Sequence, residues 1–287
     1  MPYTVEASFT SFFDKINLSG DHREIANTRR DDIVGKLGKT FTILESFSTG
    51  SIPKYTALKE HADLDVIVVL HYTQHIKHKT PTQVLQDVRN ALAEWRTGAR
   101  RNGQAVTLKY KTWPNVDIVP VSRTTDESGN VLHYNVPNEH NDTWIMSKPK
   151  KHAKSIEEQS SSCGYNFRRI VKMMKHWNRI HGDYLQSYHI EALALKVFDG
   201  NLDDTSWNVF QFFDKAKPLL EERLWIETGY ADDYLDWTDR QQILKRFDTA
   251  IGKSRSAWHK TYNPNNDHKG AIEIWKQIFG SYFPSYG

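Results

Sequence analysis

The sequence predicts an α+β protein in which a mixed, twisted sheet with helices is followed by a mostly helical region. Two observations predict this class. Short runs of β-branched residues alternate with helical patterns in the first half of the chain, and they stop before about residue 150. Beyond that point, apolar residues recur mainly at helical spacing. We therefore expect two domains, residues 1–150 and 151–287.

The expected elements of the first half are short and separated by polar turns. They are a helix after Asp21 that ends at Gly38, strands over 40–46, 64–71, 105–110 and 116–121, and a helix over 82–96. The strand over 64–71 is apolar almost throughout, which predicts a position covered on both faces. Residues 126–151 turn polar, and we expect the domain boundary in or just after this linker.

The second half is expected to contain helices over 165–180, 187–199, 239–251 and 271–279. Acidic residues lie between these segments, and we interpret them as a solvated face: Glu221, Glu222, Asp232, Asp233 and Asp236. The second domain is therefore expected to be an α-helical lobe.

Composition excludes several other classes of protein. The 287 residues are 38% hydrophobic and 25% charged, with a net charge of +3, which is ordinary for a globular protein and has no basic tail for duplex binding. A single cysteine, Cys163, excludes an internal disulfide and any zinc site built from several thiolates. The first residues lack a signal-peptide pattern, and the longest apolar run is too short to span a bilayer. We expect a cytoplasmic protein without a membrane partner.

Three carboxylates stand at the starts of apolar strands. Asp63 and Asp65 flank Leu64 and therefore point the same way, while Asp117 opens a later strand. If these strands are neighbours, the three charges converge, and their repulsion calls for a cation. Oxygen ligands favour Mg²⁺ or Mn²⁺, and two ions roughly 3.5–4 Å apart suit nucleotidyl transfer.

The alternative is that each aspartate caps a turn or meets a surface lysine, which is the commoner fate of a lone Asp-x-Asp. Gly50 and Ser51 favour the metal site, because a Gly-Ser loop lets backbone N–H groups and a hydroxyl approach a phosphate. Together with the three aspartates, this loop predicts a site for a metal-bound triphosphate.

Gly50-Ser51, Asp63-Leu64-Asp65 and the later Asp117 resemble, in order and type, the motif of nucleotidyltransferases of the DNA polymerase β superfamily. The resemblance implies a polymerase β-like nucleotidyltransferase core and a bilobal chain with the active site in the cleft. It also implies that Asp63 and Asp65 hold both metal ions. Asp117 would complete one metal site and help to activate the attacking hydroxyl.

The stretch NFRRIVKMMKHWNRIHGDYLQSYHIEALALKVF narrows the family. Its basic stripe could be a solvated helix face: Arg168, Lys172, Lys175 and Arg179. However, a lysine and an aromatic residue followed by Ser-Tyr-x-x-Glu resemble the cGAS/DncV-like nucleotidyltransferases (CD-NTases). The resemblance implies that Lys175 contacts the triphosphate, Ser187 hydrogen-bonds to phosphate and Tyr188 stacks on a base.

Two further stretches, VPNEHNDTWIMSKPKKH and IEIWKQIFGSYFP, resemble the same family, so the likeness spans nearly the whole chain. The zinc insertion of the animal sensor branch is absent, because one cysteine cannot build it. The match is therefore to the bacterial branch, whose members make cyclic oligonucleotides in anti-phage defence, and neither zinc nor a nucleic-acid activator is implied.

The leading hypothesis is a metal-dependent nucleotidyltransferase that joins nucleoside triphosphates, with ATP expected among them, into a cyclic di- or trinucleotide and releases pyrophosphate. A downstream effector protein would read this second messenger. One alternative is a template-independent transferase that acts on an RNA 3′ end. Another is a non-catalytic member of the fold that only binds nucleotide.

Overall fold

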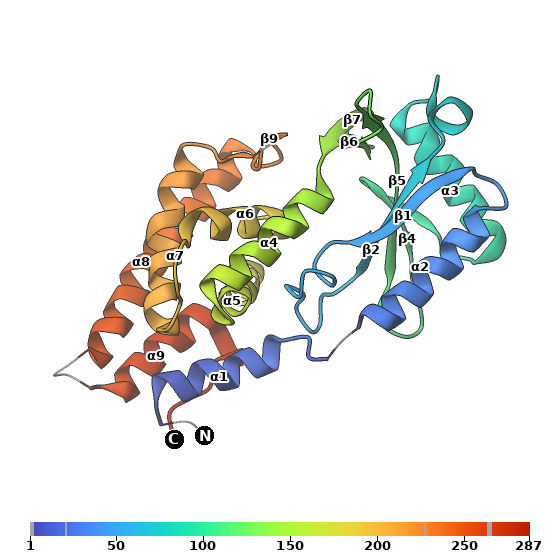
Figure 1. Cartoon of the computed structure of the whole chain (residues 1–287). Helices are drawn as coiled ribbons and strands as arrows, with labels where there is room; N and C mark the ends of the chain where they lie inside the picture. Colours follow the sequence, from blue (N-terminus) through green and yellow to red (C-terminus); the bar gives the residue numbers. More distant parts are fainter. Residues whose placement is uncertain (1–2, 21, 227, 263–265) are drawn as a thin grey trace. The chain divides into compact units, whose positions relative to one another are not determined.

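The computed structural model describes residues 3–20, 22–226, 228–262 and 266–287 (Figure 1). The chain divides into two compact units. Unit 1 comprises Met1–Ser19, Thr56–His61 and Lys154–Gly287, and unit 2 comprises Gly20–Tyr55 and Ala62–Ala153. In the sequence, the long C-terminal part of unit 1 begins just after residue 150. The first helix and one short middle segment also belong to unit 1. The predicted cleft between two lobes stays a prediction.

Unit 2 is built on a mixed seven-stranded sheet, which confirms the predicted α+β class. Its path runs β1-β2-β5-β4-β3, and β6 pairs with β5 and with β7. The bounds are β1 (Ile43–Thr49), β2 (Leu64–Leu70), β3 (Arg100–Asn102), β4 (Ala105–Leu108), β5 (Val116–Thr125), β6 (Val131–Asn138) and β7 (Thr143–Ser147). The strands β2 and β5 are parallel, and the other pairs within this sheet are antiparallel.

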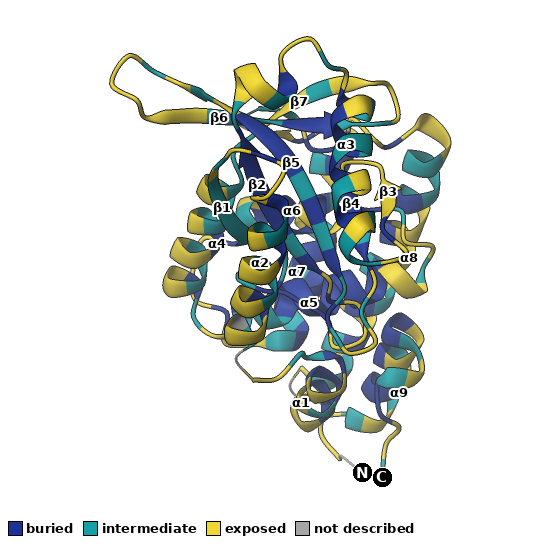
Figure 2. Ribbon diagram, turned by 90° about the vertical axis from the view of Figure 1, so that its right-hand side faces the viewer, coloured by how far each residue is buried: buried dark blue, intermediate teal, exposed yellow. Residues whose placement is uncertain are grey.

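The central strand β2 is covered on both faces, as its apolar sequence predicts (Figure 2). Leu64, Val66 and Val68 point to one face and are fully buried. Ile67 and Val69 point to the other face, where they pack with buried residues of β5 and β6. Burial on both faces holds the start of β2 rigid, and Asp63 and Asp65 lie there.

Two helices pack against this sheet, α2 (Arg23–Leu37) and α3 (Pro81–Trp95). Both lie close to their predicted ranges, and Gly38 follows α2 as predicted. The start of α3 is defined by a capping box, in which the Thr80 hydroxyl accepts from the Gln83 N–H and the Gln83 side chain accepts from the Thr80 N–H.

The polar segment 126–151 is not only a linker, as the sequence analysis expected, because it contains β6 and β7. The first two residues of β6 are exposed, whereas Tyr134 and Val136 further along the strand are buried. The strand β7 pairs only with β6, and several of its side chains are exposed. Pro137 within β6 and the polar residues before, between and after the two strands give the segment the overall composition of a loop.

Unit 1 is helical, as predicted. Its helices are α1 (Val5–Ile16), α4 (Pro149–Cys163, which starts in unit 2), α5 (Asn166–Ile180), α6 (Ser187–Val197), α7 (Thr205–Glu221), α8 (Trp237–Thr261) and α9 (His268–Phe279). A small hairpin, β8 (Trp225–Ile226) and β9 (Gly229–Tyr230), precedes α8. The helices α1, α4 and α7 were not predicted. No helix in the described part of the chain is long and apolar enough to cross a membrane.

The helix α1 belongs to unit 1 because its aromatic side chains pack against the end of the chain. Phe9 makes edge contacts with Trp275 and Phe279, at ring-centroid distances of 5.0 and 6.0 Å. Phe12 packs on Phe279 at 4.7 Å and on Phe283 at 5.6 Å. These partners are more than 260 residues away in sequence, so local periodicity does not reveal the pairing.

The predicted solvated acidic face is wrong at one residue. Asp232 is only 1% exposed, and its carboxylate pairs with the guanidinium groups of Arg240 and Arg223. Two arginines compensate for the desolvation of this charge, which makes burial possible. Asp236 caps α8 by accepting from the N–H of Asp239 at 2.8 Å.

Candidate active site

Strand register brings the predicted carboxylates together in unit 2. In the parallel pair β2–β5, Asp65 lies opposite Asp117, and in β1–β2 it lies opposite Thr49. Residues paired across strands project from the same face, so the carboxylates of Asp65 and Asp117 are neighbours. Asp63, two residues before Asp65, lies on the same side of the strand entrance.

Gly50 follows β1 and touches this group directly. Its φ of +77° is in the left-handed region, and a Cβ there would lie 1.7 Å from Oδ2 of Asp65 and 2.7 Å from its Cγ. Only glycine allows the backbone to pass so close to the carboxylate. The Gly50-Ser51 loop and the aspartates therefore form one local site.

We expect Gly50→Ala to lower kcat/KM for pyrophosphate release by about 10²-fold, because the new methyl group displaces either the loop or the Asp65 carboxylate. The matched control is Gly98→Ala. Gly98 also has a positive φ, +89°, but nothing lies within 4 Å of its Cβ position. Both variants place alanine at a positive φ, so an equal loss of activity in both would contradict the close approach.

Neighbouring side chains hold two of the acids. The Thr107 hydroxyl donates to Oδ1 of Asp117 at 2.5 Å, and the Asn115 amide donates to Oδ1 of Asp63 at 3.3 Å. Burial raises the pKa of Asp117; the Thr107 hydrogen bond opposes this rise, and the negative charge of Asp63 adds to it. Thr107 and Asn115 were not singled out from the sequence, because these contacts depend on register.

The types and positions of these carboxylate residues are suitable for binding a hard divalent cation. Carboxylate oxygens are the ligands that Mg²⁺ and Mn²⁺ prefer, and a cation would offset both the burial that raises the pKa of Asp117 and the repulsion from Asp63 that adds to this rise. Within the described residues, no three His, Cys, Asp or Glu side chains are yet gathered closely enough to hold an ion. The fit therefore rests on donor chemistry, on the Asp65–Asp117 register and on the close approach of the Gly50 backbone to the Asp65 carboxylate.

Lys175 lies on α5 in unit 1, and its side chain is only 4% exposed. Its Nζ donates to Oε1 of Glu191 at 2.7 Å, and to the carbonyl and hydroxyl oxygens of Thr56 at 3.2 and 3.1 Å. The Thr56 hydroxyl also donates to Glu191 Oε1 at 2.6 Å. The predicted phosphate ligand is thus part of a buried ion pair, and sequence reasoning missed both of its partners.

Lys172, one turn before Lys175, is also buried, at 5% exposure. It donates to Oδ1 of Asn17, at the end of α1, at 2.5 Å. Burial, together with the positive charges of Lys175 and Arg168, lowers the pKa of Lys172 to about 8. The basic stripe is therefore not a solvated helix face along its whole length.

Ser187 and Tyr188 are the first residues of α6, and both are exposed. The Tyr234 hydroxyl accepts from the backbone N–H of Gln186 at 2.8 Å and contacts Nδ1 of His189 at 3.0 Å. Tyr234 thereby holds the start of α6 from both sides of the Ser-Tyr pair. The sequence analysis did not single out Tyr234, which lies 45 residues beyond His189.

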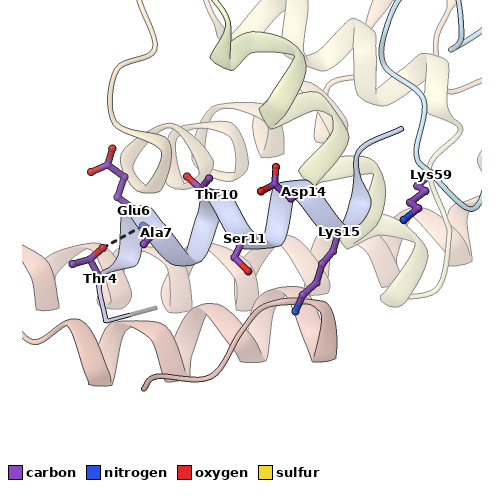
Figure 3. Close-up of a pocket in the computed structure, with 8 residues that line it drawn as sticks. All are labelled: Thr4, Glu6, Ala7, Thr10, Ser11, Asp14, Lys15 and Lys59. Carbon is purple, nitrogen blue, oxygen red and sulfur yellow. Dashed lines mark hydrogen bonds between the residues drawn. The ribbon is translucent and has the colours of Figure 1, made fainter. Parts of the chain in front are cut away.

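A groove of about 780 Å³ runs along α1 (Figure 3). Its lining is polar and of mixed charge: Thr4, Glu6, Ala7, Thr10, Ser11, Asp14, Lys15 and Lys59. The Thr4 hydroxyl in this group caps α1 by accepting from the N–H of Ala7 at 3.2 Å. None of the predicted site residues lines the groove, so we assign it no part in the chemistry.

Several known proteins are similar to this chain in sequence and in fold. Residues 3–160 match the family described as the Second Messenger Oligonucleotide or Dinucleotide Synthetase domain. A probable cyclic nucleotide synthase of Bacillus cereus (strain VD146) is 22% identical over 100% of this chain and 99% of its own length. A cyclic AMP-AMP-AMP synthase of Acinetobacter sp. is 24% identical over 90% of this chain and 78% of its own length.

The fold agrees with the sequence matches. The structure of CdnC from Escherichia coli with ATP has a TM-score of 0.78 and 18% sequence identity, and the match covers 97% of this chain and 98% of that one. The predicted family is confirmed, since the family match alone spans more than half of the chain. The chain belongs to the second messenger oligonucleotide or dinucleotide synthetase family and is a nucleotidyltransferase of the CD-NTase type.

Proposed function

We propose that this protein is a metal-dependent cyclase that joins nucleoside triphosphates into a cyclic di- or trinucleotide and releases pyrophosphate. The observation that carries the proposal is the register of β2 and β5, which sets Asp65 opposite Asp117 with Gly50 against the Asp65 carboxylate. Few tasks other than binding cations explain a group of acids at the mouth of strands that are otherwise apolar.

Enzymes of this family generally use divalent metal ions. We propose that Asp63, Asp65 and Asp117 hold two Mg²⁺ or Mn²⁺ ions, which would supply Lewis-acid stabilisation of charge on the phosphate oxygens. Asp117 would also help to activate the attacking hydroxyl by accepting its proton. The Thr107 hydroxyl donates to one oxygen of this carboxylate, which supports a fixed orientation for it.

The step is an in-line displacement at the α-phosphorus of one triphosphate. The oxygen of a ribose hydroxyl on the acceptor nucleotide bonds to the α-phosphorus, and the bond from that phosphorus to the oxygen bridging the β-phosphate breaks. Pyrophosphate leaves, and the hydroxyl proton passes to Asp117. Repeating the same displacement within the linear product closes the ring.

The remaining proposed ligands hold the donor nucleotide. The Gly50 N–H and the Ser51 hydroxyl suit phosphate oxygens. On α6, the hydroxyl of Ser187 suits a phosphate oxygen and the exposed ring of Tyr188 suits a base, which it would stack on. Lys175 is proposed to meet the triphosphate as a point charge, although it is bonded to Glu191 and Thr56.

Relatives support ATP as one substrate. The Acinetobacter relative is named for a cyclic AMP-AMP-AMP product, and the E. coli CdnC structure contains ATP. We propose that the product acts in the cytoplasm as an anti-phage signal and is read by a downstream effector protein. A signalling role fits the matched family, which is described by the synthesis of second messenger oligonucleotides or dinucleotides.

The main alternative is transfer of nucleotides to an RNA 3′ end. The test is to incubate the protein with Mg²⁺ and each nucleoside triphosphate, alone and in mixtures, with and without a short single-stranded RNA, and to measure pyrophosphate. We expect release without RNA and no stimulation by RNA. Release that requires RNA would support the alternative, and no release under either condition would favour a non-catalytic member of the fold.

A further inference from the structure

One row of cross-strand neighbours runs across the sheet. It has a polar side chain on each of the strands β1, β2, β5, β4 and β3. Successive cross-strand pairs set Thr49 against Asp65, Asp65 against Asp117, Asp117 against Thr107, and Thr107 against Arg100. Paired residues point to the same face of a sheet. All five residues of this row therefore share the face on which the carboxylates lie.

Side-chain bonds support the shared face at the β3 end of the row. The Asn102 amide donates to the Thr107 hydroxyl at 3.4 Å, and that hydroxyl in turn donates to Asp117. Arg100 is two residues before Asn102 on β3, so it points to the same side. The strand β3 is the edge of the sheet path (Figure 2).

This inference rests on the proposed function, which gives the two ends of the row different roles. The Gly50-Ser51 loop stands at the β1 end, next to Asp65, and would hold the phosphates that leave. In-line displacement requires the attacking hydroxyl on the side of the α-phosphorus away from the leaving group. The acceptor nucleotide would then lie beyond Asp117, over β4 and β3.

We propose that Arg100 binds a phosphate group of the acceptor nucleotide. Two inter-strand spacings separate it from Asp117, about 10 Å between backbones, which an arginine and a nucleotide together can span. Arg100 is exposed, and its side chain makes no hydrogen bond or ion pair with any other residue in the described ranges. A planar guanidinium matches phosphate oxygens in a bidentate arrangement.

Arg101, the next residue, provides a matched control. It points to the opposite face of β3, and its Nε pairs with Oε1 of Glu139 at 3.1 Å. Arg100→Gln and Arg101→Gln remove the same charge from adjacent positions of one edge strand. Only the first removes it from the face that carries the carboxylates.

The test separates the two substrate roles with two analogues of ATP, or of the nucleotide that the wild type uses. The 2′,3′-dideoxy triphosphate has no ribose hydroxyl and acts only as donor. The α,β-methylene triphosphate cannot be cleaved at its α-phosphorus and acts only as acceptor. Pyrophosphate release is measured while each analogue is varied in turn.

We expect Arg100→Gln to raise KM for the acceptor analogue about 10- to 100-fold, the range for losing a charge-assisted phosphate contact. We expect kcat and KM for the donor analogue to stay within about twofold, Arg100→Lys to recover part of the loss, and Arg101→Gln to resemble the wild type. An unchanged acceptor KM, equal rises in donor and acceptor KM, or the same effect in Arg101→Gln would overturn the inference. Absence of pyrophosphate from the wild type would instead overturn the proposed function.

Discussion

Replacing Asp63 and Asp65 together by asparagine is expected to lower the rate of pyrophosphate release by about 10³-fold or more. Asparagine keeps the shape of each side chain but removes the negative charge that attracts a divalent cation. A coupled assay for pyrophosphate with saturating Mg²⁺ and nucleoside triphosphates measures the loss. Mn²⁺ binding, followed by electron paramagnetic resonance, is expected to weaken in parallel.

The same variant is expected to remain folded. Asp63 is exposed and Asp65 is partly exposed, and removing the Asp63 charge relieves repulsion with Asp117. The control is Asp31→Asn with Asp87→Asn, which removes the same charge from α2 and α3 of unit 2. We expect full activity in the control and similar thermal unfolding in all three proteins. Wild-type activity in the Asp63/Asp65 variant would disprove the metal-site assignment.

Lys175→Met is expected to destabilise unit 1 by about 3–5 kcal/mol, because it leaves the Glu191 carboxylate buried without its cation. Glu191 is 1% exposed, so water does not compensate for the loss. The double variant Lys175→Met with Glu191→Gln is expected to recover most of this stability. The glutamine is neutral and its oxygen still accepts from the Thr56 hydroxyl. Chemical denaturation followed by circular dichroism measures the difference.

The double variant also separates the two roles of Lys175. If Lys175 contacts the triphosphate, the double variant should have a KM for ATP that is raised about 10- to 100-fold, although its stability is nearly restored. Wild-type kinetics in that variant would mean that Lys175 acts only through its ion pair with Glu191 and Thr56. The single variant alone does not decide this, because lost stability also lowers activity.

Local sequence was sufficient for the parts of the site that lie next to each other along the chain. An apolar run that starts with Asp63-Leu64-Asp65 predicted a buried strand with two acids at its entrance, and β2 is that strand. Alternation along a strand also predicted that these two acids share a side. The type of each element near the site could therefore be inferred from periodicity.

Contacts between distant segments could not be predicted in the same way. The bonds from Lys175 to Thr56 join residues 119 positions apart, so a helical pattern on α5 does not reveal that this lysine is buried in an ion pair. Strand register could not be predicted from local sequence either. The pairing of Asp117 with Thr107 and of Thr107 with Arg100 becomes visible only when β3, β4 and β5 are aligned.

Sequence composition led to wrong predictions for two features, the strands β6 and β7 and the buried carboxylate of Asp232. The segment that forms β6 and β7 has the composition of a linker because Pro137 and polar turn residues interrupt its apolar residues, and Asp232 is buried because two arginines neutralise it. In both cases the deciding partner lies elsewhere in the chain. A sequence pattern shows the residue but not the partner that permits its position.

The most direct test of the account is the mass of the product that the wild type makes from nucleoside triphosphates and Mg²⁺ without nucleic acid. The account predicts a product that carries one phosphate per nucleoside and has the mass of a closed ring. This product should resist phosphatase and be absent from the Asp63→Asn/Asp65→Asn variant. A product that keeps a 5′-triphosphate and loses phosphate to phosphatase, or an equal yield from the variant, would contradict it.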